Sequence, residues 1–153
     1  MTLLLDILTP DMIQVNYECK TRDEAVSLVG QLLVTKGYAK ESYINAMIRN
    51  IATNGSYIVI APGIAMPHAR PEEGVLAIGL SLVTLKEPVV FGHPKNDPVT
   101  IVIGLCAVDH QSHLEALSEL VDILGNEEKI RGIKEATSAK EMLAIIKGGA
   151  KND

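Results

Sequence analysis

The chain has 153 residues, a mass of 16.5 kDa and a formal net charge of −5 at pH 7, which is the size of one domain with a sizeable core. Hydrophobic residues make up 47 % of it, too many for a disordered protein. Its longest apolar stretches, residues 75–85 and 99–108, are shorter than the about 20 residues of a membrane helix. The acidic charge and the scarcity of aromatic residues argue against a nucleic-acid partner.

Two further features favour a cytoplasmic protein. Asp6 interrupts the apolar start MTLLLDIL, which also has no basic leader, so we expect no signal peptide. Cys19 and Cys106 are too few and too far apart to indicate a disulfide scaffold. We therefore expect a soluble protein in a reducing, cytoplasmic setting.

The first third of the sequence predicts one strand and two helices. Apolar and polar residues alternate over residues 13–20, which is typical of a half-buried strand. Thr21 and Glu24 have the spacing of a capping box, so we expect a helix to begin after Thr21 and to end at Gly37. The apolar spacing over residues 41–52 predicts a second helix.

Three strands are predicted in the middle of the chain, over residues 57–61, 75–85 and 99–108. The last two are almost continuously apolar, which is typical of strands that are covered on both faces. The segment between them, residues 91–98 with the sequence FGHPKNDP, is rich in residues that interrupt strands, so we expect a loop there.

The last third of the sequence predicts three helices. Ser112 and Glu115 have the spacing of a second capping box, which would make His113 the first helical residue. The apolar face expected on this helix consists of Leu114, Leu117, Leu120, Val121 and Leu124. A short helix is predicted over residues 127–136, and a third capping box at Ser138 predicts a final helix through residue 146.

This order of elements predicts an α+β fold, β-α-α-β-β-β-α-α-α. Helices on both faces of one mixed sheet would cover its apolar strands, which gives a three-layer α/β/α sandwich. We assign residues 1–147 to this domain and residues 148–153 to a flexible tail. The order is not a repeated βαβ pattern and no glycine-rich nucleotide motif occurs, so we expect no nucleotide cofactor.

The segment most informative about chemistry is APGIAMPHARP, residues 61–71. Pro67 restricts its own backbone and that of Met66, so His68 follows a stiff, apolar lead-in at the edge of the sheet. Such a lead-in would hold the imidazole with one ring nitrogen facing outward. Arg70 lies two residues further on.

His113 is the second candidate, because a helix start presents free backbone N–H groups and favours a bound anion. The same position disfavours a charged imidazole. We therefore hypothesise that His68 accepts a phosphoryl group on nitrogen, and that His113, the helix start and an arginine stabilise the phosphoryl oxygens. Imidazole suits this task because it is partly neutral near pH 7 and forms a labile N–P bond.

GIAMPHAR, residues 63–70, resembles the active-site motif of enzyme IIA of the bacterial phosphoenolpyruvate-dependent sugar phosphotransferase system, in its mannitol/fructose-type superfamily. SHLEALSEL, residues 112–120, resembles that family's second histidine segment. The likeness covers nearly the whole chain. Within the superfamily, residues 61–71 and 91–99 look most like the ascorbate-type branch.

This resemblance implies a phosphocarrier. His68 would accept the phosphoryl group from the histidine-containing phosphocarrier protein and pass it to a cysteine of the cognate enzyme IIB, which in turn works with a membrane enzyme IIC. His113 would be the second active-site histidine. An arginine on the second helix accompanies the site in the family, and Arg49 is its match here; the usual Arg-Glu pair is Arg49-Asn50 in this chain, and Arg70 is the alternative. Ser112 would support the site at the helix start.

Several alternatives stay open at this point. A regulatory binding module, switched by phosphorylation of His68, would use the same two histidines. A metal hydrolase is a weaker alternative, because Asp109, His110 and His113 lack a further ligand at metal-binding spacing. His110 competes with His113 for the role of second histidine.

For the remaining candidates the structural interpretation is favoured. We expect His93 to be a turn residue, and we expect Cys19 and Cys106 to be inert buried thiols. Apolar strand edges would permit a homodimer. The sequence does not specify the transported sugar.

Overall fold

A mixed five-stranded sheet forms the middle of three layers in the computed structural model, which describes residues 6–148. In spatial order its strands are β1 (Ile13–Tyr17), β4 (Gly79–Val89), β5 (Val99–Cys106), β3 (Ile64–Ala65) and β2 (Val59–Ala61). The pairs β1–β4 and β3–β5 are parallel, whereas β4–β5 and β2–β3 are antiparallel. The predicted α+β sandwich with a mixed sheet is confirmed.

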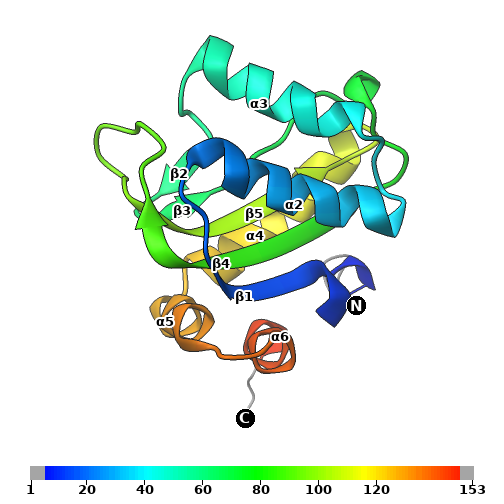
Figure 1. Cartoon of the computed structure of the whole chain (residues 1–153). Coiled ribbons are helices and arrows are strands. Elements are labelled where there is room, and N and C mark those ends of the chain that lie inside the picture. Colours follow the sequence, from blue (N-terminus) through cyan, green and yellow to red (C-terminus); the bar gives the residue numbers. More distant parts are fainter. Residues whose placement is uncertain (1–5, 149–153) are drawn as a thin grey trace.

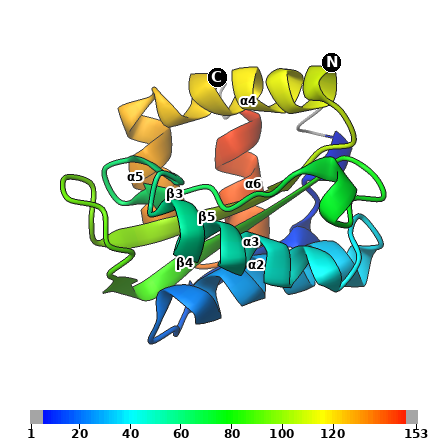
Figure 2. The same cartoon turned by 90° about the horizontal axis from the view of Figure 1, so that it is seen from above.

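Helices cover both faces of this sheet (Figures 1 and 2). One face carries α2 (Arg22–Lys36) and α3 (Ser42–Asn54), and the other carries α4 (His110–Leu124), α5 (Glu127–Glu135) and α6 (Ala139–Lys147). Two single-turn 3-10 helices, η1 (Pro10–Met12) and η2 (Pro71–Glu73), precede β1 and β4. No helix within residues 6–148 has the length and apolar character needed to cross a bilayer.

Two of the three predicted N-caps are present. The Thr21 hydroxyl accepts the Glu24 N–H at 3.2 Å, and the Ser138 hydroxyl accepts the Glu141 N–H at 3.1 Å. Gly37 ends α2 with φ of 89°, a left-handed conformation that glycine adopts without strain.

The third predicted cap is wrong. The Asp109 carboxylate caps α4 by accepting the Ser112 N–H at 2.8 Å. Asp is as good an N-cap as Ser, and Asp109 is the first strong capping residue after β5. The helix therefore begins at His110, and His113 is its fourth residue rather than its first.

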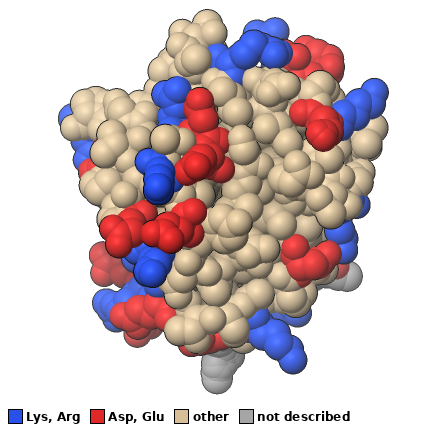
Figure 3. Space-filling view, in the orientation of Figure 1, with Lys and Arg blue, Asp and Glu red and all other residues tan. Residues whose placement is uncertain are grey.

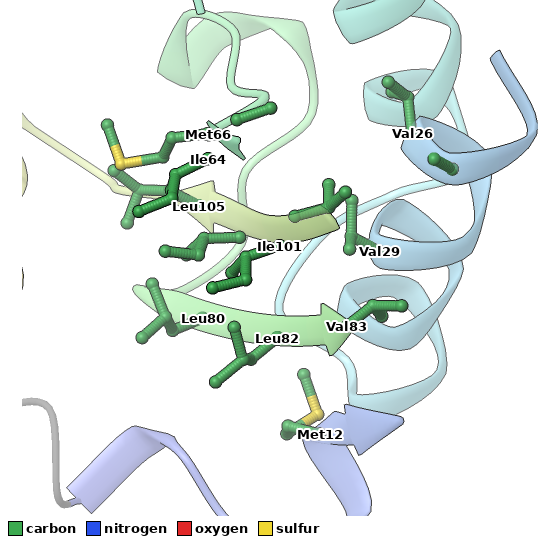
Figure 4. Close-up of a cluster of buried hydrophobic side chains, with 14 of the residues drawn as sticks. Met12, Val26, Val29, Ile64, Met66, Leu80, Leu82, Val83, Ile101 and Leu105 are labelled. Carbon is green, nitrogen blue, oxygen red and sulfur yellow. The ribbon is translucent and has the colours of Figure 1, made fainter. Parts of the chain in front are cut away.

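The core lies on both sides of β4 and β5, whose side chains are mostly buried, as their apolar character predicts (Figure 4). Lys86, Glu87 and Pro88 of β4 are exposed. The buried polar exceptions are Thr84, whose hydroxyl accepts the Asn16 N–H at 2.9 Å, and Ser81, which packs against α2. The buried Ser81 hydroxyl donates to the Val29 carbonyl at 2.8 Å. A Cβ at Gly104 would lie 2.9 Å from the Val29 Cβ, so only glycine lets the helix approach so closely.

Three details of the elements differ from the prediction. Strand β4 begins at Gly79, four residues later than expected, and Leu76 before it is 54 % exposed. Strand β3 was not predicted, because two residues carry no periodicity. Leu114 and Val121 of α4 are exposed, and the buried stripe of that helix is Ala116, Leu120 and Ile123.

The predicted tail, residues 148–153, lies outside the described residues except for Gly148. Gly148 is the C-cap of α6, with φ of 141°.

Candidate active site

A cavity of about 540 Å³ opens where the loop after β3 meets the beginning of α4. Side chains of α3 and of the segment between α3 and β2 form its remaining wall. The residues that line it are Tyr43, Asn50, Asn54, Tyr57, His68, Ala69, Arg70, Pro71, Leu105, Ala107, Asp109, His110 and His113. The structure thus brings His68, His113, His110 and Arg70 to one cavity.

His68 has its ring fixed by the backbone beside it. Its Nδ1 lies 2.8 Å from the Met66 carbonyl oxygen. A carbonyl only accepts hydrogen bonds, so Nδ1 carries the proton, and in the neutral ring Nε2 holds a free lone pair. The stiff lead-in therefore leaves one ring nitrogen available to an incoming electrophile.

The loop that carries His68 is fixed at several points along its backbone. The Met66 N–H donates to the Ile58 carbonyl at 2.8 Å, and the Pro67 carbonyl accepts the Leu105 N–H at 3.2 Å. The Met66 side chain is 3 % exposed and lies with Ile64 and Leu105 in the core (Figure 4). The loop is thus part of the packed sheet edge and not a free segment.

Tyr43 of α3 provides a further anchor that sequence reasoning missed. Its hydroxyl accepts the Ala69 N–H at 2.9 Å and lies 2.7 Å from the Leu105 carbonyl, to which it can donate. The side chain is fully buried, and this burial raises the pKa of the Tyr43 phenol far above its usual value. Tyr43 therefore stays protonated and links the residue after His68 to the end of β5.

His113 lies next to His68 across the cavity, with 5.6 Å between the two ring centroids and an interplanar angle of 50°. Partial burial lowers the pKa of His113 below its usual 6.5, and the nearby His68 and His110 lower it further. Its ring is consequently neutral near pH 7. His110 lines the same cavity as the first residue of α4.

Ser112 lies outside the cavity that His110 and His113 line. Its N–H is used by the Asp109 carboxylate. That hydrogen bond lowers the pKa of Asp109, because it favours the charged carboxylate.

The two candidate arginines occupy different places. Arg70 lines the cavity of His68, and it also lines a neighbouring cavity of about 260 Å³. Arg49 lines only the neighbouring cavity, and its Nη2 lies 3.8 Å from a Glu73 carboxylate oxygen. The geometry therefore places Arg70, and not Arg49, beside His68.

Three polar residues of the cavity were not expected from the sequence. The Asn50 Nδ2 lies 2.8 Å from the Tyr57 hydroxyl, and the Asn54 Nδ2 lies 2.6 Å from the Asn50 Oδ1. The four-residue spacing of Asn50 and Asn54 places them on one helix face, which is the only signal the sequence offers. Tyr57 is recognisable only once the chain is folded.

The other candidates are structural. The His93 Nδ1 lies within hydrogen-bond distance of the Lys95 and Asn96 N–H groups, in the loop between β4 and β5. Cys19 and Cys106 are buried, and burial raises the pKa of the Cys106 thiol to about 12. No group of three His, Cys, Asp or Glu side chains that could hold a metal ion occurs within residues 6–148.

Charges on the surface are mixed. On the face shown in Figure 3, Lys and Arg side chains lie interspersed with Asp and Glu, and neither sign forms a continuous field. The described part of this face therefore has no basic patch of the kind that binds nucleic acid.

Comparison with known proteins gives consistent matches over most of the chain. The family model described as "Phosphoenolpyruvate-dependent sugar phosphotransferase system, EIIA 2" matches residues 6–149. The ascorbate-specific PTS system EIIA component of Escherichia coli (strain K12) is 41 % identical over 135 residues, which is 88 % of this chain and 88 % of the relative.

Solved structures of enzyme IIA proteins also match this chain. The mannitol-specific cryptic phosphotransferase enzyme IIA of Escherichia coli has a TM-score of 0.86 and 38 % identity, and the match covers 95 % of this chain and 99 % of that one. Enzyme IIA in a complex of mannitol enzyme IIA with phosphorylated enzyme IIB from Escherichia coli has a TM-score of 0.81 and 27 % identity, over 92 % and 97 % of the two chains.

Proposed function

Since the chain belongs to the EIIA 2 family of the phosphoenolpyruvate-dependent sugar phosphotransferase system, we propose that it is a phosphocarrier that holds the phosphoryl group on His68 Nε2. The observation that carries this proposal is the bond between His68 Nδ1 and the Met66 carbonyl. It leaves Nε2 as the unprotonated nitrogen of a ring that lines the cavity.

The donor is a histidine-containing phosphocarrier protein in the cytoplasm. The Nε2 lone pair of His68 attacks phosphorus, and the N–P bond of the donor breaks with its electron pair returning to the donor ring. His68 then carries phosphorus on Nε2 and the proton on Nδ1, so its ring is positively charged. The Met66 carbonyl stabilises this charge through the hydrogen bond it already makes.

The second step passes the group to a cysteine of an enzyme IIB. The thiolate attacks phosphorus, the N–P bond breaks, and its electron pair returns to Nε2 of His68. The complex of mannitol enzyme IIA with phosphorylated enzyme IIB, formed by a structural relative, supports this partner. Enzyme IIB would then serve a membrane enzyme IIC, and the ascorbate-specific relatives support ascorbate as the transported compound.

Cationic and neutral hydrogen-bond donors of the cavity stabilise the phosphoryl oxygens. Arg70 supplies positive charge, and neutral His113 supplies a ring N–H beside His68. Phosphoryl transfer depends mainly on alignment and on charge stabilisation, and this arrangement offers both. Ser112 supports the site by keeping the first turn of α4 attached to Asp109.

The test is transfer from labelled phosphoenolpyruvate in a mixture of purified enzyme I, the phosphocarrier protein and this chain. We expect a label that is stable to base and labile to acid, present in the wild type and in His93→Ala and absent in His68→Ala. Labelling of His68→Ala would contradict the assignment. Label that forms on His68 but does not move to any enzyme IIB would favour the regulatory module instead.

A further inference from the structure

Tyr57, in the segment between α3 and β2, lies beside His68. The two ring centroids are 6.0 Å apart and the rings meet edge to face at 85°. Tyr57 lines the same cavity as His68 and is 48 % exposed. The phenol ring thus lies beside the imidazole that we propose to be phosphorylated.

The amide of Asn50 has only one orientation that satisfies its neighbours. Its Nδ2 lies 3.4 Å from the His68 carbonyl oxygen, and a carbonyl can only accept. Its Oδ1 lies 2.6 Å from the Asn54 Nδ2, which can only donate. The nitrogen of Asn50 therefore faces Tyr57, and Asn54 holds it in that orientation.

This orientation decides what the Tyr57 hydroxyl does. The Asn50 Nδ2 donates to the Tyr57 oxygen at 2.8 Å, so that oxygen is an acceptor in this contact. Its own hydrogen must point elsewhere, and no acceptor for it is found within residues 6–148. A phenol that receives a hydrogen bond is also a better donor, because successive hydrogen bonds polarise one another.

We propose that the Tyr57 hydroxyl, held by Asn50 and Asn54, donates a hydrogen bond to a phosphoryl oxygen on His68. This inference rests on the proposed function. The O–H bond stays intact throughout, so Tyr57 binds the phosphoryl group and transfers no proton. Asn50 and Asn54 are positioning residues that act through Tyr57.

The uncharged amide at position 50 is important for this arrangement. A carboxylate there would accept hydrogen bonds only, so it would draw the Tyr57 hydrogen toward itself and place a negative charge beside the phosphoryl group. Asn50 avoids both effects. Tyr57 and Arg70 line the same cavity, and so both would act on the phosphoryl group.

The test is the equilibrium of phosphoryl exchange between the phosphocarrier protein and this chain. Tyr57→Phe removes one oxygen from a half-exposed side chain and leaves the fold intact. We expect the equilibrium constant for formation of phospho-His68 to fall about tenfold, near the lower end for a hydrogen bond to a charged group, because Tyr57 is half exposed. Tyr17→Phe, at a tyrosine that is 44 % exposed and outside this cavity, should match the wild type.

A double variant separates positioning from a general structural effect. If Asn50 acts through Tyr57, then Asn50→Ala should lower the equilibrium constant in the wild type and change it little in the Tyr57→Phe background. Equal constants for Tyr57→Phe and wild type would overturn this inference and leave the proposed function standing. A wild type that takes no label on His68 would overturn both.

Discussion

The two sides of the cavity are built differently. On one side, the loop that carries His68 is attached to the rest of the fold at nearly every residue, through Ile58, Tyr43 and β5. On the other side, the first turn of α4 presents His110 and His113 and is held at its start by the Asp109 cap.

This difference shows that the two histidines depend on different features of the fold. Under the proposed function, His68 needs one ring nitrogen in one place, and a backbone carbonyl inside a packed loop provides that. In the same proposal, His113 only has to offer a neutral ring near the phosphoryl group, and the exposed first turn of a helix suffices for it. His68 should therefore respond to changes in packing, and His113 to changes in capping and charge.

The largest effect is expected from charge on the His68 side. Arg70→Gln should slow phosphoryl transfer to His68 about tenfold or more, because it removes a cation that can form charge-assisted hydrogen bonds to the phosphoryl oxygens. Arg49→Gln should have a smaller effect, since Arg49 lines only the neighbouring cavity and lies near Glu73. Rapid-quench measurements give the transfer rates of both variants. A larger loss of rate in Arg49→Gln than in Arg70→Gln would contradict the placement of Arg70 beside His68.

The next effect tests the packing of the His68 loop. Tyr43→Phe leaves the Ala69 N–H and the Leu105 carbonyl without their shared partner, so we expect a loss of about 2 kcal/mol in the free energy of unfolding. Urea titration measures it, and Tyr17→Phe is the exposed control. The same variant should slow phosphorylation of His68, whereas unchanged stability would show that the loop does not depend on Tyr43.

A smaller effect is expected at the α4 cap. Asp109→Ala should lower Tm by a few degrees, while Asp109→Asn should lower it less, because Asn is a good cap that lacks only the charge. The folded pKa of Asp109 lies below its usual 3.8, so the carboxylate stabilises the fold above that pH and loses its effect as the pH falls through the folded value. Thermal melts at neutral and acidic pH should therefore show the gap between Asp109→Ala and wild type closing in acid.

The smallest effect concerns the charge on His113. Its folded pKa lies below the usual 6.5, so the unfolded chain takes up the proton first, and stability falls as the pH drops from about 6.5 through the folded value. His110→Ala removes one neighbouring imidazole and should raise the pKa of His113 only part of the way, since burial is the main cause. The pKa of His113 is measured from its ring chemical shifts in an NMR pH titration. An unchanged pKa in His110→Ala would mean that His110 does not affect the pKa of His113.

Local patterns were sufficient for much of this architecture. The Thr21 and Ser138 caps, the long buried strands and the helices on both faces depend on residues close together in the chain, so the sequence predicts them. The same holds for His68, whose orientation depends on Met66, two residues before it.

The sequence did not predict which of two neighbouring residues caps α4, nor which side chains of that helix are buried. Asp109 and Ser112 are both good caps, and periodicity does not rank them. The burial of the α4 face likewise depends on where the helix meets the sheet, so Leu114 and Val121, which fit an apolar stripe, are exposed.

By itself the sequence determined the layers, most element boundaries and the presence of a histidine with one free ring nitrogen at the sheet edge, because these follow from short-range backbone preferences and apolar periodicity. Only the tertiary structure decided which distant groups surround that histidine: Tyr43 beneath its loop, Asn50 and Tyr57 on one side, and Arg70 in place of Arg49. Those contacts join separate elements, and they depend on the order of the strands and on the residue at which each helix begins.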